Sequence, residues 1–330
     1  MSRCRRPPAA ARLRATSGAL AAALGPVAIR AAVTVSAVFA LIVFSPGYAL
    51  RAPGTGSGEN AAEALYACGS PIVSEAIPEV ARVYVTCMAR LARADLGAFG
   101  GEPLWRRLAQ GSARTVALIV AALVLGLLLG TTAGLLLERQ EGTAIGAGLR
   151  GGLPIVSLVP VFALAYLTQP LAGPAAEAAS SSAGLLGLAT GIGVAAAACL
   201  ALGDGTLAEI ARVTALHAAR IRNAPFMRTE RALGGRVARH FGRNLAVPLL
   251  DLWANRFLFL LSGAIVAESI FDLHGLGWLL YEAFRYRDLL PALGAAAATV
   301  GIVELNRALV GLVRNRIEPR RPERRRDVLR

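Results

Sequence analysis

The feature that most constrains this chain is a long apolar stretch without a single charged side chain. It runs from Val116 to Leu137 and is made almost entirely of Ala, Val, Leu, Ile and Gly. A helix needs about 20 such residues to cross the hydrocarbon core of a bilayer. The whole chain is 55 % hydrophobic, whereas soluble domains average roughly 45–50 % even when Gly is included. The stretch therefore indicates a membrane protein.

Other windows of the sequence have the same character, although less cleanly. The third of them is short and contains Pro154 and Pro160, which membrane helices tolerate because neighbouring helices satisfy the freed backbone groups. We expect an all-α polytopic membrane protein with about six transmembrane helices. The predicted spans are 31–50, 116–137, 153–167, 183–202, 248–268 and 291–313.

The distribution of arginine predicts the orientation. All 35 basic residues are Arg, and they cluster in residues 1–30, 204–244 and 314–330. Because basic loops stay on the cytoplasmic side, these three regions are expected there, and an even number of spans agrees with two cytoplasmic termini. The predicted organisation is a basic N-terminus (1–30), a first helix (31–50), an extracytoplasmic segment (51–114), a five-helix core (115–313) containing a cytoplasmic loop (204–247), and a basic tail (314–330).

Several function classes are disfavoured by residues that are missing. Arg clusters beside apolar spans indicate topology and contacts with anionic lipid rather than binding of nucleic acid. Without a single Lys, the chain cannot form a P-loop, so any use of ATP requires another subunit. No Cys-x-x-Cys or clustered His indicates a metal site, and the three His lie outside the predicted spans. An enzyme is therefore a poor candidate, and transport a better one.

Two of the four cysteines, Cys68 and Cys87, lie in the predicted extracytoplasmic segment. An oxidising compartment allows a disulfide between them to persist. Two separate thiols remain the alternative.

Two polar stretches carry recognisable patterns. The first, in the cytoplasmic loop, has Arg228-Thr229, Arg231-Ala232 and Gly234, followed by His240, Asn244 and Pro248; its coarse pattern is an amphipathic helix, a Gly-Gly pair and a second helix that ends at Pro248. The second lies outside the membrane after the fifth span and has Glu268, Phe271, Gly275-Leu276-Gly277, Trp278 and Asp288. The chain resembles the permeases of ABC importers, specifically the dipeptide/oligopeptide/nickel family. The first pattern resembles the coupling (EAA-type) loop of these permeases.

This resemblance extends along most of the chain through motifs in the same order. They include Pro46-Gly47, Asp95-Leu96-Gly97, the helix opening at Thr115, Pro160-Val161-Phe162 and Glu318-Pro319-Arg320. The resemblance implies a bacterial inner-membrane permease that forms half of a pathway for a small solute, a peptide or similar. It also implies a second homologous permease, two cytoplasmic ATPase subunits holding ATP and Mg, an extracytoplasmic binding protein, and no cofactor in this chain.

The same resemblance suggests roles for both patterns. Residues of the coupling loop would contact the ATPases, and residues of the outer stretch would face the pathway and the docked binding protein. There, Phe271, Leu276, Trp278 and the aromatic residues up to Tyr286 would form a re-entrant element suited to the membrane interface. A simple interfacial anchor is the alternative.

Charged residues inside the last two spans are a further candidate site. Asp251 and Arg256 lie in the fifth span, and Glu304 and Arg307 in the sixth. Ionisable groups at such depth usually pair or face an aqueous cavity. We expect them to pair across the two helices near an inner gate, unless Arg256 and Arg307 extend to the lipid head groups instead.

Two other function classes compete with the importer. An ion-gradient-driven secondary transporter would be expected to show internal repeats, and none is visible between the halves. A membrane enzyme would need a buried His or a cluster of carboxylates inside the spans.

Overall fold

The computed structural model describes residues 9–44, 66–67, 70–71, 77–99, 101–180, 191–233, 235, 237–286 and 288–317. The chain divides into two compact units, one of residues 1–105 with 283–304 and one of residues 106–282 with 305–330. Helices dominate both units, and the strands within the described residues form only two short antiparallel hairpins. The predicted all-α class is confirmed.

The first unit contains the N-terminal helix, both hairpins and parts of the last helices. Its elements are α1 (Ala9–Val43), β1 (Tyr66–Ala67), β2 (Ser70–Pro71), α3 (Ile77–Ala92), β3 (Ala98–Phe99) and β4 (Glu102–Pro103). Tyr84 of α3 contacts α1 twice: its ring meets Phe39 edge-on at 5.1 Å, and its hydroxyl lies 2.7 Å from Ser36 Oγ. These contacts fix α3 against the apolar part of α1.

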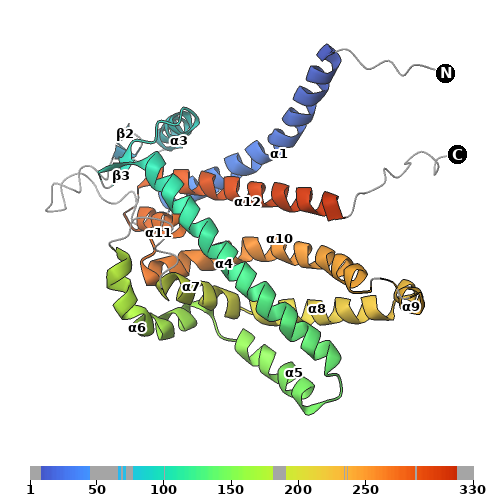
Figure 1. The fold of residues 1–330 in the computed structure, drawn as a ribbon. Coiled ribbons are helices and arrows are strands. Elements are labelled where there is room, and N and C mark those ends of the chain that lie inside the picture. Colours follow the sequence, from blue (N-terminus) through green and yellow to red (C-terminus); the bar gives the residue numbers. More distant parts are fainter. Residues whose placement is uncertain are drawn as a thin grey trace, which may run out of the picture. The chain divides into compact units, whose positions relative to one another are not determined.

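The second unit contains most of the longer helices. They are α4 (Leu104–Arg139), α5 (Ala144–Ser157), α6 (Val161–Ser180), α7 (Gly191–Leu202), α8 (Thr206–Asn223), α9 (Pro225–Ala232), α10 (Val237–Phe271), α11 (Leu276–Tyr286) and α12 (Leu289–Ile317), of which α4, α11 and α12 also reach into the first unit. Helices α8 and α10 run side by side, with α9 at the end where the chain passes from one to the other (Figure 1). Helix α10 also packs against α6 and α7, and α5 packs against α8.

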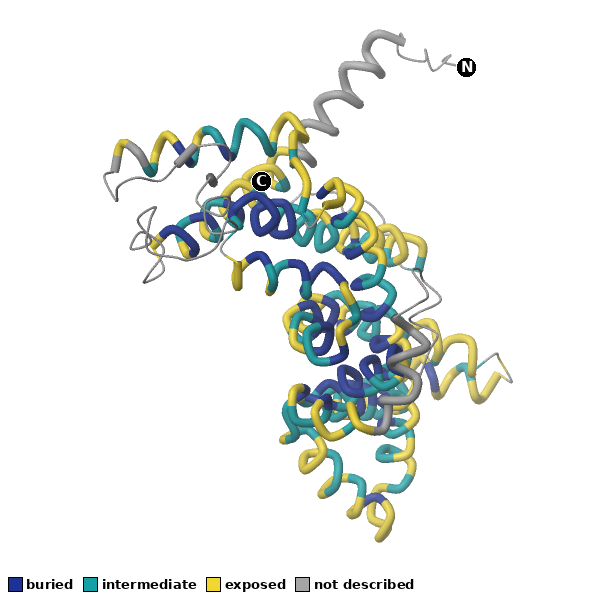
Figure 2. Tube along the Cα trace, turned by 90° about the vertical axis from the view of Figure 1, so that its left-hand side faces the viewer, coloured by how far each residue is buried: buried dark blue, intermediate teal, exposed yellow. Residues whose placement is uncertain are grey.

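Close packing of α4 against α8 depends on small residues. A Cβ at Gly130 would lie 2.6 Å from Ile210 Cγ2, and a Cβ at Gly134 would lie 2.7 Å from Thr214 Cβ. Membrane helices lack a hydrophobic driving force toward one another, so such small residues allow the backbones to approach closely. Figure 2 shows buried positions concentrated where helices run beside one another.

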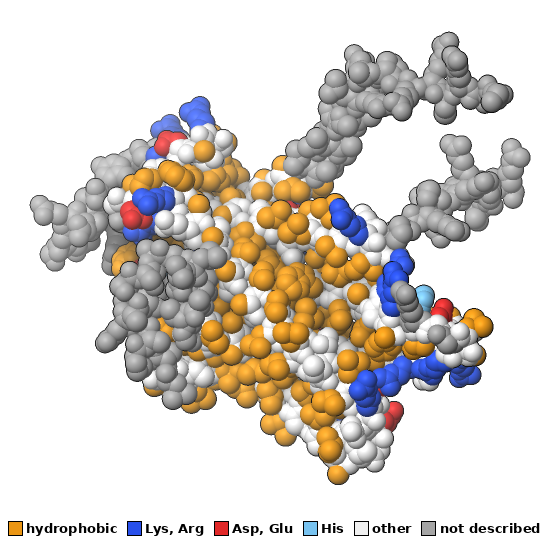
Figure 3. All heavy atoms as spheres, viewed as in Figure 1, with side chains coloured by type: hydrophobic (Ala, Val, Ile, Leu, Met, Phe, Trp, Pro, Cys, Tyr) orange, Lys and Arg blue, Asp and Glu red, His pale blue; other side chains and the backbone are white. Residues whose placement is uncertain are grey.

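Four helices are long and apolar enough to cross a membrane, and up to six spans result if each of two bent pairs counts as one. The single helices are α4, α10, α12 and the Gly25–Val43 part of α1. They contain the predicted second, fifth and sixth spans and part of the first, whose residues 45–50 lie outside the described residues. Hydrophobic side chains cover the visible face of α4 (Figure 3). The prediction of several membrane-spanning helices is confirmed.

Several predicted boundaries are wrong. The third span, 153–167, is not one helix: it breaks between α5 and α6, which are bent by 87°. The fourth predicted span, 183–202, ends where α7 ends. The next helix, α8, forms a bent pair with α7 and occupies part of the region that was expected to be a loop. Helix α4 begins at Leu104, before the predicted start of the second span at Val116, because the polar turns before the apolar run are also helical.

The second helix of the coupling loop does not end at Pro248. This proline lies inside α10, which is continuous from Val237 to Phe271. Pro248 removes one helical hydrogen bond, whereas the surrounding apolar helix keeps its packing against α6, α7 and α8.

Candidate functional site

The predicted coupling segment folds as the short helix α9, between α8 and α10. Pro225 occupies its first turn, where the missing N–H costs nothing, and Ala224 before it is extended (φ −64°, ψ 140°). Met227 is fully buried and anchors the helix. Phe226, Arg228, Thr229, Arg231, Ala232 and Leu233 are exposed. The helix therefore presents a basic and apolar surface, and Met227 is its one buried side chain.

Local contacts fix the turn that follows α9. Thr229 Oγ1 donates to the Pro225 carbonyl (3.3 Å), and the Gly235 N–H donates to the Glu230 carbonyl (2.8 Å). The Glu230 carboxylate lies 3.6 Å from His240 Nε2 in the first turn of α10. Gly234 lies outside the described residues.

The remaining polar side chains of the segment differ in whether they form hydrogen bonds within the chain. Arg231 reaches the Arg222 carbonyl at 3.5 Å, and Asn244 Nδ2 donates to the His240 carbonyl (2.8 Å) within α10. Arg228 has no hydrogen bond or ion pair within the described part of the chain. Its guanidinium is thus available to a partner.

The outer stretch is organised around Glu268, near the end of α10. Its side chain is 1 % exposed and accepts from Thr115 Oγ1 of α4 at 2.5 Å and from the Trp278 N–H at 3.0 Å. The same Thr115 hydroxyl accepts the Leu276 N–H at 2.8 Å. Together these two side chains satisfy orphan N–H groups at the start of α11. We call this arrangement the Glu268–Thr115 cap.

Glycines make room for the cap. A Cβ at Gly275 would collide with the Glu268 carboxyl group, and one at Gly277 would lie 2.7 Å from Ile265 Cα. Gly111 of α4 meets the same turn, since a Cβ there would lie 3.1 Å from the Leu276 nitrogen. Arg114 adds a hydrogen bond to the His274 carbonyl (3.1 Å). The Gly-Leu-Gly motif thus serves close approach of three backbone segments.

The residues expected to line the outer mouth therefore divide into two groups. Glu268, Phe271, Gly275, Leu276 and Gly277 are buried and build the element, whereas the exposed residues of α11 are Tyr281, Phe284, Arg285 and Tyr286. Trp278 is half-buried, with its ring 4.3 Å from that of His274.

Asp288 caps the following helix. Its Oδ1 accepts the Leu290 N–H at 3.3 Å near the start of α12. Burial raises the pKa of the Asp288 carboxyl group, and this hydrogen bond partly opposes the shift.

Three of the four charges expected at an inner gate, Asp251, Arg256 and Glu304, have partners outside that set. Asp251 accepts from Arg314 at 3.0 Å, which does join α10 to α12. Arg256 instead pairs with Glu209 of α8, and Glu304 pairs with Arg30 of α1. Arg256 and Glu304 thus pair with residues of helices other than the expected ones, whereas the Asp251–Arg314 pair joins the helices of the fifth and sixth spans.

One of the two cysteines expected to form a disulfide is described. Cys87 is buried and disulfide-bonded, whereas Cys199 is free. The expected partner of Cys87, Cys68, lies outside the described residues.

Thr115 was predicted only to open a helix, and no role was predicted for Glu209, Arg314 or Arg30. Each meets its partner across at least 47 residues of sequence, so no local pattern could have indicated it. Among the described residues, no group of three or more His, Cys, Asp or Glu is placed to hold a metal ion.

Comparison with known proteins gives a consistent result. The model of the family described as "Binding-protein-dependent transport system inner membrane component" matches residues 126–321. The probable peptide ABC transporter permease protein y4tP of Sinorhizobium fredii is 25 % identical over 254 residues, covering 72 % of this chain and 79 % of that protein.

A shorter region is similar to another permease. The glutathione transport system permease protein GsiC of Pectobacterium atrosepticum is 38 % identical over 93 residues, covering 27 % of this chain and 30 % of that protein. GsiC of Escherichia coli K12 is 37 % identical over the same length and coverage. The chain thus spans most of y4tP but under a third of either GsiC protein in the matched region.

Proposed function

This chain belongs to the family of inner membrane components of binding-protein-dependent transport systems, and from that membership we propose that it forms half of the translocation pathway of an ATP-binding-cassette importer. The solute is a peptide or a similar small molecule. The resemblance to a peptide permease over 72 % of the chain supports this choice.

The partners follow from what the chain lacks and what it exposes. A second homologous permease supplies the other half of the pathway, and a binding protein outside the membrane delivers the solute. Two cytoplasmic ATPase subunits supply ATP and Mg, since a chain without Lys has no P-loop of its own. The N- and C-termini and α9 face the cytoplasm, as their arginines favour.

The observation that carries the proposal is the exposed helix α9, held by one buried Met and presenting Arg228 and Arg231. Arg side chains also gather around it (Figure 3). A short helix of this kind fits a groove on a partner subunit, with its apolar and basic side chains as contacts. These residues, with Thr229, Ala232 and Gly234, form the ATPase contact.

The continuity of α10 explains how a push on α9 reaches the other side of the membrane. Helix α10 begins five residues after α9 and continues unbroken to Phe271, a length of about 50 Å at 1.5 Å per residue. Its far end carries Glu268, which caps α11. A movement of α9 during nucleotide binding therefore moves the start of α11 through one rigid helix, switching between two states of the pathway.

The experiment is co-purification from native membranes. The tagged chain should bring down P-loop ATPases and a second permease, and Arg228→Glu should reduce recovery of the ATPases without reducing recovery of the permease. Arg139→Glu, at the exposed end of α4, is the matched control and should retain both. Recovery of ATPases at the wild-type level with Arg228→Glu, or of the chain alone in every case, would refute the proposal.

A further inference from the structure

Two helix breaks lie directly against each other in the second unit. One separates α5 from α6 at residues 158–160, and the other separates α7 from α8 at residues 203–205. Asp204 joins them: its N–H donates to the Val159 carbonyl, and its Oδ1 accepts the Val161 N–H, both at 3.2 Å. Gly203 permits this contact, because a Cβ there would lie 2.7 Å from Val161 Cγ2.

Paired breaks of this kind have a functional meaning in a membrane protein. Each bent pair has the length and hydropathy of a span only when its two helices are taken together, with bends of 87° and 54°. Non-helical backbone at membrane depth occurs where it is buried in protein or lines a water-filled cavity. In secondary transporters, interrupted helices are also where solutes bind.

A cavity of about 730 Å³ lies beside these breaks. Its volume falls within the roughly 300–1,000 Å³ of small-molecule sites. Ser157, Asp204 and Gly205 line it from the breaks themselves. The rest of its wall comes from the end of α4, from α5, from α8 and from Arg256 of α10, with apolar contributions from Leu137, Leu153, Pro154, Ala208, Ala215 and Leu216.

The charges around the cavity are mixed, with three arginines and four carboxylates. Arg256 is engaged by Glu209, and Glu138 lies 3.1 Å from Arg222. Within the described residues no hydrogen bond or ion pair engages Glu141, Arg150 or Arg212. The cavity therefore offers uncompensated charge of both signs.

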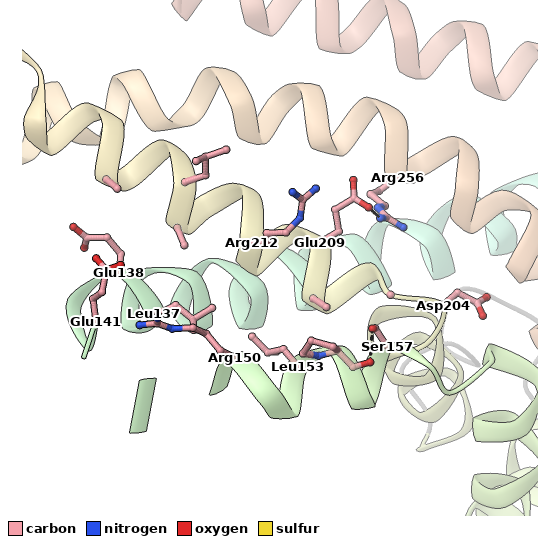
Figure 4. Close-up of a pocket in the computed structure, with 16 residues that line it drawn as sticks. Leu137, Glu138, Glu141, Arg150, Leu153, Ser157, Asp204, Glu209, Arg212 and Arg256 are labelled. Carbon is pink, nitrogen blue, oxygen red and sulfur yellow. Dashed lines mark hydrogen bonds and ion pairs between the residues drawn. The ribbon is translucent and has the colours of Figure 1, made fainter. Parts of the chain in front are cut away.

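The two ends of the cavity carry different charges. Figure 4 shows Glu138 and Glu141 at the end away from Ser157 and Asp204, with the Arg150 side chain extending toward that end, while Arg212 lies on α8 beside the Glu209–Arg256 pair. Because Arg256 already neutralises Glu209, the guanidinium of Arg212 is left for a ligand. The Glu141 carboxylate has the same freedom at the other end.

We propose that this cavity binds a zwitterion with an apolar body, a short peptide with both termini free. Arg212 binds its carboxylate and Glu141 binds its ammonium group, while the apolar wall contacts its side chains. This inference rests on the proposed function and names a solute site within this subunit. An anionic lipid head group fits less well, since it would leave the Glu141 carboxylate in the wall without a cationic partner.

The test combines changes in the protein with changes in the ligand. The full-length chain in phosphatidylcholine nanodiscs is titrated with alanyl-leucine, its N-acetyl derivative and its C-terminal amide. We expect either capped form to bind at least about fivefold more weakly than the free dipeptide, the loss of one charge-assisted contact. Arg212→Gln should weaken binding of the free and acetylated forms about fivefold but leave the amide unchanged.

Glu141→Gln should give the reverse pattern, weakening the free dipeptide and the amide but not the acetylated form. Arg220→Gln, an exposed arginine of the same helix outside the cavity wall, is the control and should change none of the three. Equal effects of either variant on all three ligands, or no binding of the free dipeptide, would overturn the inference. Binding of phosphatidylglycerol that is lost with Arg212→Gln, without dipeptide binding, would overturn it in favour of a lipid site.

Uptake in cells separates this inference from the proposed function. If removal of the chain leaves binding-protein-dependent uptake unchanged, the proposed function itself fails. If uptake of alanyl-leucine depends on the chain while Arg212→Gln and Glu141→Gln keep the wild-type KM, only the assigned site fails.

Discussion

Replacing Thr115 by Val removes the hydroxyl group of the Glu268–Thr115 cap and leaves the shape of the side chain nearly unchanged. Thr115 is 1 % exposed, so water cannot take the place of the hydroxyl. The change deletes the 2.5 Å bond to Glu268 and the 2.8 Å bond from the Leu276 N–H. Two polar groups are then left unsatisfied in a buried place.

The expected cost follows from these two groups. An unsatisfied buried donor or acceptor costs about 1–3 kcal/mol. The two together amount to about 2–6 kcal/mol, which mostly weakens the attachment of α11. Thr115→Ser keeps both hydrogen bonds and loses one methyl group, at a cost of about 1 kcal/mol. The difference between the two variants isolates the hydroxyl group from the packing.

Amide hydrogen exchange measures this difference where it arises. With Thr115→Val, the Leu276 to Trp278 amides should exchange at least about tenfold faster than with Thr115→Ser, since each 1.4 kcal/mol of opening free energy is a factor of ten. Amides in the middle of α8 serve as the internal reference and should not change. Equal exchange rates at the Leu276 amide in the two variants would show that the cap does not hold α11. Helix α10 could then not transmit movement of α9 to α11 through the cap.

Three further predictions concern other contacts. Gly275→Ala should lower the thermal unfolding midpoint because its Cβ collides with the cap, whereas Gly148→Ala in α5 meets nothing within 4 Å and should be neutral or slightly stabilising; similar midpoints for both would contradict the crowding. Asp251→Asn should lower the free energy of unfolding by less than about 1 kcal/mol, since the ion pair with Arg314 is partly exposed. The double variant Asp251→Arg with Arg314→Asp, which exchanges the two residues, should have the wild-type unfolding midpoint. A larger loss with Asp251→Asn, together with a lowered midpoint in the double variant, would mean that the pair has another role. Burial raises the pKa of Asp288, so its contribution to stability is full below the unfolded pKa and is lost as pH rises through the folded pKa; Asp288→Asn should therefore raise the midpoint at pH 7 more than at pH 4, and an equal effect at both pH values would contradict the sign.

Hydropathy was sufficient to predict the spans that consist of one unbroken helix. Residues 116–137, 248–268 and 291–313 all fall inside single helices of the structure, because about 20 apolar residues in sequence leave the backbone no favourable alternative to internal hydrogen bonding in lipid. The beginnings of these helices were placed too late, since polar turns that extend a helix carry no hydropathy signal.

The bent spans show where such reasoning fails. Pro160 marks a possible interruption, but prolines inside membrane helices are common, and Pro248 lies within a continuous helix. The difference is made by Asp204, which accepts the N–H that follows Pro160 from 43 residues away. The motif around Gly275 was noticed for its glycines, yet its purpose required Glu268 and Gly111 to be seen beside it.

The sequence by itself determined the class of the protein, its apolar spans and its family, because these depend on composition, on length and on motifs read in order. Only the tertiary structure decided which charge meets which. Arg256 pairs with Glu209 and Asp251 with Arg314, and the paired helix breaks lie against the cavity. The physical reason is that electrostatic and hydrogen-bonding partners are chosen by distance in space, and in a bundle of long helices that distance is set by helix packing rather than by separation along the chain.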